Sequence, residues 1–189
     1  MERREVDFFD AKADVEALLA LTGKTGEYRF QPADQPALHP GMAAEILFQG
    51  NHIGWVGGLH PGIGEKLNLD RPVFLFELAC TVFEEARVPI YREISRFPAI
   101  RRDLAVTVEA SLPAAEILKC VKNVAGNLLI NLELFDEYRG KGIDSGRKSF
   151  AMGLTLQESS RTLKDSEVDA LLARIVVALE TEFKAKLRQ

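Results

Sequence analysis

Two segments of alternating apolar residues, separated by a glycine-spaced basic stretch, constrain the fold of this chain more than any other feature. A period of two is typical of strands that bury one face. The two segments are therefore expected to pair as a β-hairpin with a basic tip. The apolar positions are Leu128, Ile130, Leu132 and Leu134 in the first segment, and Phe150, Met152, Leu154 and Leu156 in the second.

The end of this hairpin carries one aromatic ring, Tyr138, among four basic residues. Bases of a single-stranded nucleic acid stack on such rings, and phosphates contact cations. A carboxylate at Asp136 could accept hydrogen bonds from the Watson–Crick edge of guanine, and the Ser149 hydroxyl could donate to a base or a phosphate. The candidate nucleic-acid contacts are therefore Asp136, Tyr138, Arg139, Lys141, Arg147, Lys148 and Ser149.

Each candidate also has an ordinary structural interpretation. Tyr138 could be a packed strand aromatic, Asp136 could bond a turn amide, and charged hairpin tips are commonly just solvated. Strand phase does not decide between the two interpretations: a regular strand would place Asp136 and Tyr138 on the buried side with Leu132 and Leu134, but the strand is expected to twist or fray near its end. A binding role requires the strand to twist or fray near its end.

Residues 95–189 are expected to form a ferredoxin-like domain in an α+β protein. An alternating strand over residues 104–108 precedes a helix over residues 114–121. After the hairpin, a long helix is expected to begin at a capping Asp165, and residues 184–188 are expected to add a short edge strand. The order β-α-β-β-α-β places two helices over one face of a four-stranded sheet. This fold hosts many functions and decides none by itself.

Residues 1–94 are expected to hold a partial module, an antiparallel sheet with one helix that ends near Gly23. A tight turn is expected at Gly50-Asn51. One helix on one sheet is thin for an independent domain, so this half looks like part of something larger. The charged segment Phe83–Phe97 is expected to link the halves. The expected strands are Tyr28–Gln31, Ala43–Phe48, Ile53–Leu59 and Val73–Thr81.

The charge is distributed unevenly along the chain, whose net charge is −4. Residues 1–94 hold 9 Lys and Arg against 15 Asp and Glu, whereas residues 95–189 hold 15 against 13. Binding of nucleic acid would therefore be local and selective. The sequence contains no run of 18 apolar residues, so no membrane span is expected. Isolated Cys80 and Cys120 and the absence of a signal-like start favour the cytoplasm.

No catalytic or metal site is expected. The three histidines, His39, His52 and His60, have no carboxylate or thiol at ligand spacing, and hydrogen bonding in turns explains His39-Pro and His60-Pro better. Gly23-Lys-Thr25 lacks the first glycine of a phosphate-binding loop.

Several ordered motifs of the second half resemble the ferredoxin-fold anticodon-binding domain of the bacterial phenylalanyl-tRNA synthetase β-subunit family. The first half resembles the preceding module of that family, which has a class II synthetase core-like fold without catalysis. The chain thus resembles the C-terminal part of a longer subunit. The segments that carry the resemblance are Phe97–Ala105, Leu134–Gly142, Lys148-Ser149 and Arg161–Asp165, and, in the first half, Val6–Asp10, Leu38–Gly41, Gly54–Pro61 and Phe76–Leu78.

The resemblance implies a tRNA-binding, non-catalytic part of phenylalanine–tRNA ligase. The expected partners are the anticodon region of tRNA(Phe) and the α subunit of a heterotetramer, where the chemistry would take place. ATP and Mg²⁺ would be used by the whole enzyme, and no cofactor is expected on this chain. The alternative is a ferredoxin-like small-molecule regulatory domain, which a glycine-rich loop after the first strand would favour. The sequence Glu109–Pro113 is not such a loop.

Overall fold

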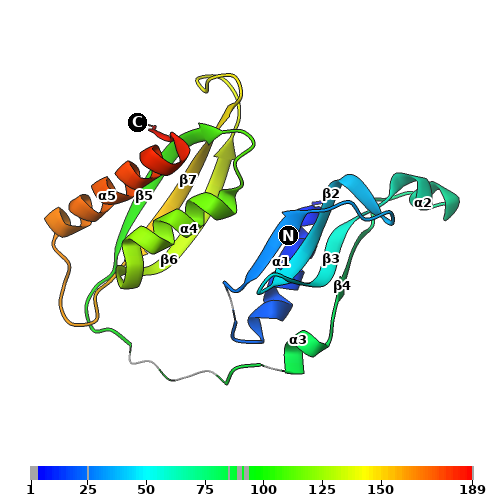
Figure 1. Cartoon of the computed structure of the whole chain (residues 1–189), viewed down its shortest axis with the longest axis horizontal. Coiled ribbons are helices and arrows are strands. Elements are labelled where there is room, and N and C mark those ends of the chain that lie inside the picture. Colours follow the sequence, from blue (N-terminus) through cyan, green and yellow to red (C-terminus); the bar gives the residue numbers. More distant parts are fainter. Residues whose placement is uncertain (1–3, 25, 85, 89–90, 92–93, 189) are drawn as a thin grey trace. The chain divides into compact units, whose positions relative to one another are not determined.

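The computed structural model describes residues 4–24, 26–84, 86–88, 91 and 94–188. The chain divides into two compact units, Met1–Tyr91 and Arg92–Gln189 (Figure 1). The division falls three residues before the boundary expected from the sequence. The expected linker, Phe83–Phe97, includes positions 85, 89–90 and 92–93, which lie outside the described residues.

The first unit is a four-stranded antiparallel sheet in the order β1-β2-β3-β4, with helix α1 against it. The core between them contains Val15 and Leu19 of α1, together with Ile46 and Val56 of the sheet. A mostly antiparallel sheet with one main helix agrees with the sequence prediction. The elements are α1 (Phe8–Ala20), β1 (Tyr28–Pro32), β2 (Leu38–Phe48), β3 (Asn51–Leu59), α2 (Pro61–Lys66), β4 (Phe74–Leu78) and α3 (Thr81–Glu84).

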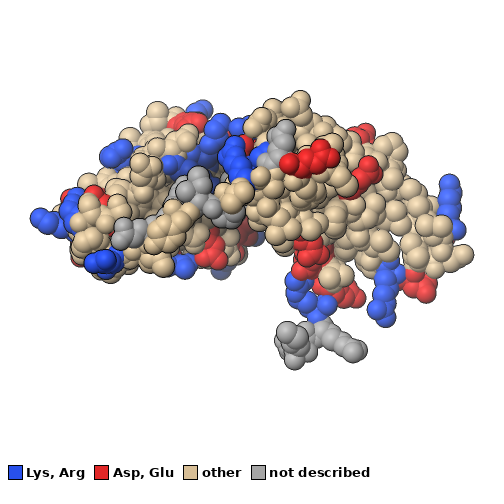
Figure 2. Space-filling view, turned by 90° about the horizontal axis from the view of Figure 1, so that it is seen from below, with Lys and Arg blue, Asp and Glu red and all other residues tan. Residues whose placement is uncertain are grey.

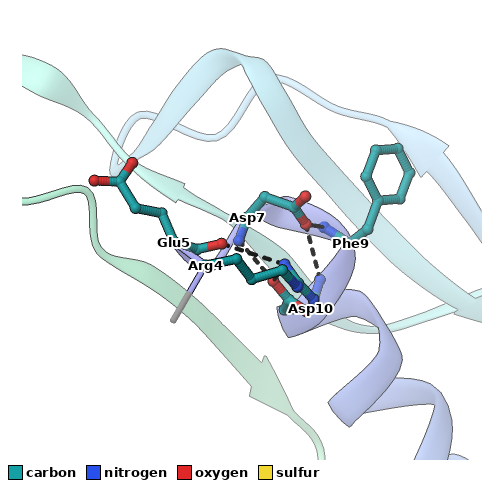
Figure 3. Close-up of polar contacts among 5 residues, drawn as sticks. All are labelled: Arg4, Glu5, Asp7, Phe9 and Asp10. Atoms are coloured by element: carbon teal, nitrogen blue, oxygen red, sulfur yellow. Dashed lines mark hydrogen bonds and ion pairs between the residues drawn. The ribbon is translucent and has the colours of Figure 1, made fainter. Parts of the chain in front are cut away.

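The start of α1 is fixed by a reciprocal pair of aspartates (Figure 3). The Asp7 carboxylate accepts the backbone N–H groups of Phe9 and Asp10 at 2.8 and 3.1 Å, and Asp10 accepts the N–H of Asp7 at 2.8 Å. These bonds satisfy N–H groups that have no partner within the helix. The guanidinium of Arg4 and then the Asp7 amide lower the pKa of Asp10.

The turn between β2 and β3 lies one residue earlier than predicted. Gln49 and Gly50 have φ of 50° and 85°, and Phe48 pairs with Asn51 across the turn. Two successive residues with positive φ are typical of the two-residue hairpin turns whose twist matches the strands. The prediction at Gly50-Asn51 was therefore wrong by one position.

The second unit has the predicted order β-α-β-β-α-β, and its sheet has the strand order β6-β7-β5-β8. Figure 1 shows α4 and α5 on the same face of this sheet. Among the described residues of this unit, no helix covers the opposite sheet face, which is called the open face below. The elements are β5 (Ile100–Glu109), α4 (Ala114–Ala125), the short 3₁₀ helix η1 (Gly126–Leu128), β6 (Leu129–Tyr138), β7 (Arg147–Leu156), α5 (Asp165–Phe183) and β8 (Lys186–Leu187).

The core of the second unit lies between the helices and alternate positions of the two central strands. Val106 of β5 and Phe150 of β7 are paired and at most 1% exposed. Ile117 of α4 and Ile175 of α5 are buried in the same cluster. Alternation along β5 and β7 therefore assigns the residues between these apolar positions to the open face.

The last long helix begins differently from the prediction. Its N-cap is Lys164, and Asp165 is the first helical residue, so the expected cap at Asp165 was wrong. A lysine side chain cannot accept a backbone hydrogen bond. Instead, Glu167 reaches back and accepts the Lys164 N–H at 2.9 Å. Among the described residues, no helix is long and apolar enough to cross a membrane.

Candidate nucleic-acid interface

A β-bulge in β6 decides which face of the sheet carries the candidate residues. Leu134 pairs with Met152, but Asp136 pairs with Ala151, so Phe135 is an extra residue in β6. An extra residue shifts the alternation of every residue beyond it by one. Glu137, which pairs with Phe150, therefore lies on the helix-covered face instead of Asp136.

Beyond the bulge, Asp136 and Tyr138 lie on the open face. Tyr138 is paired with Ser149, and Asp136 is paired with Ala151, which follows Ser149 at the second position along β7. A regular strand would have placed Asp136 and Tyr138 toward the core. The strand neither frays nor merely twists, and the bulge changes its phase.

A similar irregularity occurs at the start of β6. Leu129 pairs with Leu156 and Asn131 with Thr155, so Ile130 is also an extra residue and is 54% exposed. The predicted apolar stripe therefore contains Leu129 in place of Ile130. Leu132 and Leu134 pack against the core as expected.

The Tyr138 ring is held at the hairpin tip. Its hydroxyl donates to the backbone carbonyl of Lys141 at 3.3 Å. A Cβ at Gly140 would lie 2.7 Å from this hydroxyl oxygen, closer than such contacts occur, so glycine leaves the space that the ring fills. The residue is 37% exposed, which leaves part of the ring open to a stacking partner.

Two polar groups beside this ring are available for intermolecular hydrogen bonds. The Asp136 carboxylate and the Ser149 hydroxyl form no hydrogen bond or ion pair with any residue that the structure describes. Ser149 is nevertheless only 2% exposed. A hydroxyl and a free carboxylate next to an aromatic ring match what base recognition requires, namely acceptors and donors beside a stacking surface.

Three of the four candidate cations have partners within the protein. Arg139 contacts Glu137 through Nη2 at 2.6 Å. Arg147 donates to the backbone carbonyls of Thr107 and Lys184 at 2.6 and 3.0 Å. For the ammonium group of Lys141, no ion pair or hydrogen bond to a described residue is observed, so it is the candidate cation most available to a phosphate.

Lys148 lies on the helix-covered face and not on the open face. Its side chain is 7% exposed and its Nζ is 3.8 Å from the Glu137 carboxylate. The ammonium also lies 4.8 Å from the centroid of the Phe150 ring. Lys148 thus neutralises the acid that the bulge turns toward the core. Phosphate contacts of Lys148 and of Arg147 stay predictions, and this geometry disfavours both.

Arg101 of β5 contacts one acid of its own strand and one of the edge strand β6. Arg101 Nε is 3.3 Å from Asp103, and its Nη2 is 3.7 Å from Glu133. A Cβ at Gly153 would lie 2.7 Å from that Nη2, so the missing side chain of Gly153 makes room for the guanidinium. These ion pairs give Arg101 a structural role within the sheet.

Sequence reasoning missed one residue of the open face, Arg188. Its guanidinium carbon lies 5.2 Å from the centroid of the Tyr138 ring. The two residues are 50 positions apart in the chain, and no local pattern connects them. Only the strand order, which places β8 and β6 at opposite edges of one sheet, could have suggested that they face each other.

Two histidines form hydrogen bonds within turns, and one of the two thiols is buried. The Nδ1 atoms of His39 and His60 accept the N–H groups of Gly41 and Gly62 at 3.0 and 3.1 Å, which confirms the predicted turn bonding. Burial raises the pKa of the Cys120 thiol to about 11, so this thiol stays protonated and unreactive at neutral pH.

Figure 2 shows the distribution of charged residues on one face. On the face shown in Figure 2, lysines and arginines are interspersed with aspartates and glutamates. Attraction of a polyanion would therefore depend on a few specific cations rather than on the bulk charge.

Two family models match consecutive parts of the chain. Residues 95–188 match the ferredoxin-fold anticodon binding domain. Residues 1–80 match the phenylalanyl tRNA synthetase beta chain CLM domain. The first of these matches covers the unit that carries the open face described above.

Curated relatives cover nearly the whole chain at high identity. The phenylalanine–tRNA ligase beta subunit of Pseudomonas syringae pv. tomato is 49% identical over 187 residues, which is 99% of this chain and 24% of the relative. The beta subunit of Methylococcus capsulatus is 48% identical over 98% of this chain and 23% of the relative. For Pectobacterium atrosepticum the identity is 47%, over 100% and 24%. The chain spans about a quarter of the length of these relatives, and it belongs to the phenylalanine–tRNA ligase beta-subunit family.

Proposed function

We propose that the second unit binds the anticodon region of tRNA(Phe), as a non-catalytic part of a phenylalanine–tRNA ligase β subunit. The observation that carries this proposal is the bulge at Phe135, which puts Asp136 and Tyr138 beside Ser149 on the open face. The family match of residues 95–188 supports the same conclusion independently.

We propose a distinct task for each residue. The exposed part of the Tyr138 ring stacks on an anticodon base, and the Asp136 carboxylate accepts hydrogen bonds from the N–H groups of guanine. Ser149 donates to the same nucleotide, and Lys141 contacts a backbone phosphate. Stacking supplies affinity for any base, whereas the carboxylate discriminates among bases.

Binding of an RNA hairpin with the tRNA(Phe) anticodon tests this proposal. Loss of one stacking platform costs about 1–3 kcal/mol, so Tyr138→Ala should weaken binding about 5- to 150-fold. Tyr138→Phe keeps the ring and should retain most of the affinity. Asp136→Asn should bind an anticodon whose guanine is replaced by adenine almost as well as the native hairpin. Equal binding by wild-type protein and Tyr138→Ala would contradict the proposal.

The family match also suggests a role for the first unit. We infer that residues 1–80 form part of a class II synthetase core-like module without catalytic residues, because this segment matches the CLM domain model. Contact with the α subunit of a cytoplasmic heterotetramer follows from this assignment. ATP and Mg²⁺ would be used by the assembled enzyme.

This assignment has a direct test. Purified chain incubated with ATP, phenylalanine and tRNA(Phe) should give no aminoacylation and no pyrophosphate exchange, and both should appear with a complete enzyme as control. Activity of the chain alone would place catalytic residues here and overturn the inference.

A further inference from the structure

A row of four residues crosses the sheet of the first unit from edge to edge. Gln31 of β1 pairs with Glu45 of β2, Glu45 pairs with Trp55 of β3, and Trp55 pairs with Glu77 of β4. Directly paired residues of neighbouring strands point to the same face of a sheet. A tryptophan side chain therefore lies between two glutamates, with one on each side.

This row lies on the sheet face that α1 does not cover. The core beneath α1 contains Ile46 of β2 and Val56 of β3, the immediate neighbours of Glu45 and Trp55 in the chain. Because successive side chains of a strand point to opposite faces, Glu45 and Trp55 point away from that core. Val82 of α3 also belongs to the core beneath α1. The face that carries the row is called the tryptophan face below.

The two glutamates have no cationic partner in the part of the chain that the structure describes. Gln31 donates a hydrogen bond from its side-chain amide to Glu45, which leaves the charge of this carboxylate uncompensated. Glu77 is exposed, and it forms neither a hydrogen bond nor an ion pair with a described residue. Arg29 lies on the same face but pairs with Leu47, in the next row, and forms no ion pair with a described residue. Two uncompensated negative charges thus lie beside the tryptophan ring.

The Trp55 ring is positioned by His52. The centroids of the two rings are 4.4 Å apart, and their planes are inclined by 49°. Trp55 is half-buried, so part of its ring surface is accessible to another molecule. Among aromatic side chains, the indole ring attracts a cation over its face most strongly.

This arrangement matches the chemistry of a guanidinium group. Neighbouring strands lie about 4.8 Å apart, so the strands of Glu45 and Glu77 are about 10 Å apart, with the strand of Trp55 midway between them. A guanidinium over the ring would therefore have a carboxylate on each side. Its plane stacks on an aromatic face, and its five N–H donors point outward within that plane. An ammonium group has the charge but no plane.

The surroundings indicate a protein ligand. Small-molecule sites are concave, whereas the row lies on an open sheet face, and the cavity beside His39 and His60 does not include it. Residues 1–94 hold 15 Asp and Glu against 9 Lys and Arg, a balance that repels the phosphates of nucleic acids and of anionic lipids. The same balance attracts a basic protein segment.

We propose that the tryptophan face binds an arginine side chain of a partner protein, with the guanidinium over Trp55 and between the carboxylates of Glu45 and Glu77. The occupant follows from charge complementarity, because the face offers two acids and an aromatic ring. The proposal does not depend on RNA binding, since all three residues belong to the first unit. One cation–π contact and two exposed ion pairs are weak by themselves. The arginine is therefore one anchor within a larger interface.

The test uses the full chain, whose single tryptophan reports on this face. The probe is a capped pentapeptide with one central arginine among alanines and glycines. It should change the fluorescence emission and the indole N–H resonance of Trp55 in a saturable manner. The same peptide with citrulline, which is uncharged, should change neither signal. The peptide with lysine should need at least about 3-fold more for a half-maximal change.

Substitutions of single acids locate the binding site. Glu45→Gln and Glu77→Gln should each raise the half-maximal peptide concentration about 2- to 5-fold, the range expected for one exposed ion pair. Glu65→Gln is the matched control, because it removes an exposed acid of α2 outside the row and should have no effect. Circular dichroism should be identical for all variants, because each substitution keeps the shape of the side chain.

Four outcomes would overturn the proposal. The arginine peptide could leave both Trp55 signals unchanged, or the citrulline peptide could titrate like the arginine peptide. Equal titration by lysine and arginine would show general attraction of cations, and equal losses in Glu77→Gln and Glu65→Gln would show an effect of net charge alone. The tRNA(Phe) anticodon hairpin should not change the emission of Trp55. A change with this RNA and none with the arginine peptide would assign the face to RNA.

Discussion

At the scale of single residues, acids and bases of the second unit mostly stabilise local structure. Arg161 donates to both carboxylate oxygens of Glu167, at 2.7 and 2.9 Å, and the Lys164 N–H donates to one of them. The hydrogen bond from Arg161 and then that from the Lys164 amide lower the pKa of Glu167 to about 2. One carboxylate thus anchors both the preceding loop and the first turn of α5.

This shift predicts a pH dependence of stability. Because the pKa of Glu167 is lower in the folded than in the unfolded chain, its stabilisation is present above the unfolded pKa. It is lost as the pH falls from about 5 toward 2. Glu167→Gln should lower the melting temperature at pH 7 but have little effect near pH 2.5. Asp169→Asn is the control, since this exposed acid of α5 forms no ion pair within the described residues. If the difference in melting temperature between wild type and Glu167→Gln were the same at every pH, the assignment would be contradicted.

At the scale of elements, the bulge in β6 is the feature that creates the candidate site. The sequence predicts the hairpin well, because both strands alternate and the turn is rich in glycine. It marks the bulge only as a break in the alternation, where the apolar Leu134 and Phe135 are followed by two acids. Such a break does not reveal on which face the later residues lie. The register between β6 and β7 determines on which face each residue lies. Tyr138 pairs with Ser149 on the open face, and Glu137 pairs with Phe150 on the helix-covered face.

Deletion variants test the role of the bulge. Removing Phe135 should restore a regular strand while keeping Asp136 opposite Ala151 and Tyr138 opposite Ser149, so RNA binding should survive. Removing Glu137 should shift Tyr138 by one position toward the helix-covered face, and binding should be lost. The measurements are hairpin binding and thermal unfolding of both variants. If the Phe135 deletion folds but does not bind, the bulge must do more than determine on which face Asp136 and Tyr138 lie.

The two lysines of the hairpin should behave oppositely. Lys148→Ala removes a buried partner of Glu137 and should lower the free energy of unfolding by about 1–2 kcal/mol, a value reduced because Glu137 is partly exposed. Lys141→Ala should leave stability unchanged but reduce the slope of log affinity against log salt by about 0.7–0.9. Chemical unfolding and a salt series of RNA binding separate the two effects. A lower salt slope for Lys148→Ala would restore the phosphate contact first expected of it.

At the scale of the whole molecule, each unit has its own sheet and its own hydrophobic core. Residues 92–189 expressed alone should therefore unfold cooperatively and bind the anticodon hairpin with the affinity of the full chain. Circular dichroism melting and RNA binding of this fragment check the expectation. A fragment that does not fold would show that the first unit supports the second. The sequence predicted the second unit more completely than the first, because its helices and strands have clear apolar periods. The contact between Arg188 and Tyr138, which joins the two edges of its sheet, could not be predicted because no local sequence pattern connects them.

The brevity of β8 has a consequence for temperature. This strand has two residues, and besides its pairing with β5 the Lys186 carbonyl accepts a bond from the Thr107 hydroxyl at 3.3 Å. Short edge segments open locally at free energies far below that of global unfolding. Warming should therefore release Arg188 from the Tyr138 ring while both helices persist. The contact between Arg188 and the Tyr138 ring would then be lost at a lower temperature than the core between the helices and the sheet.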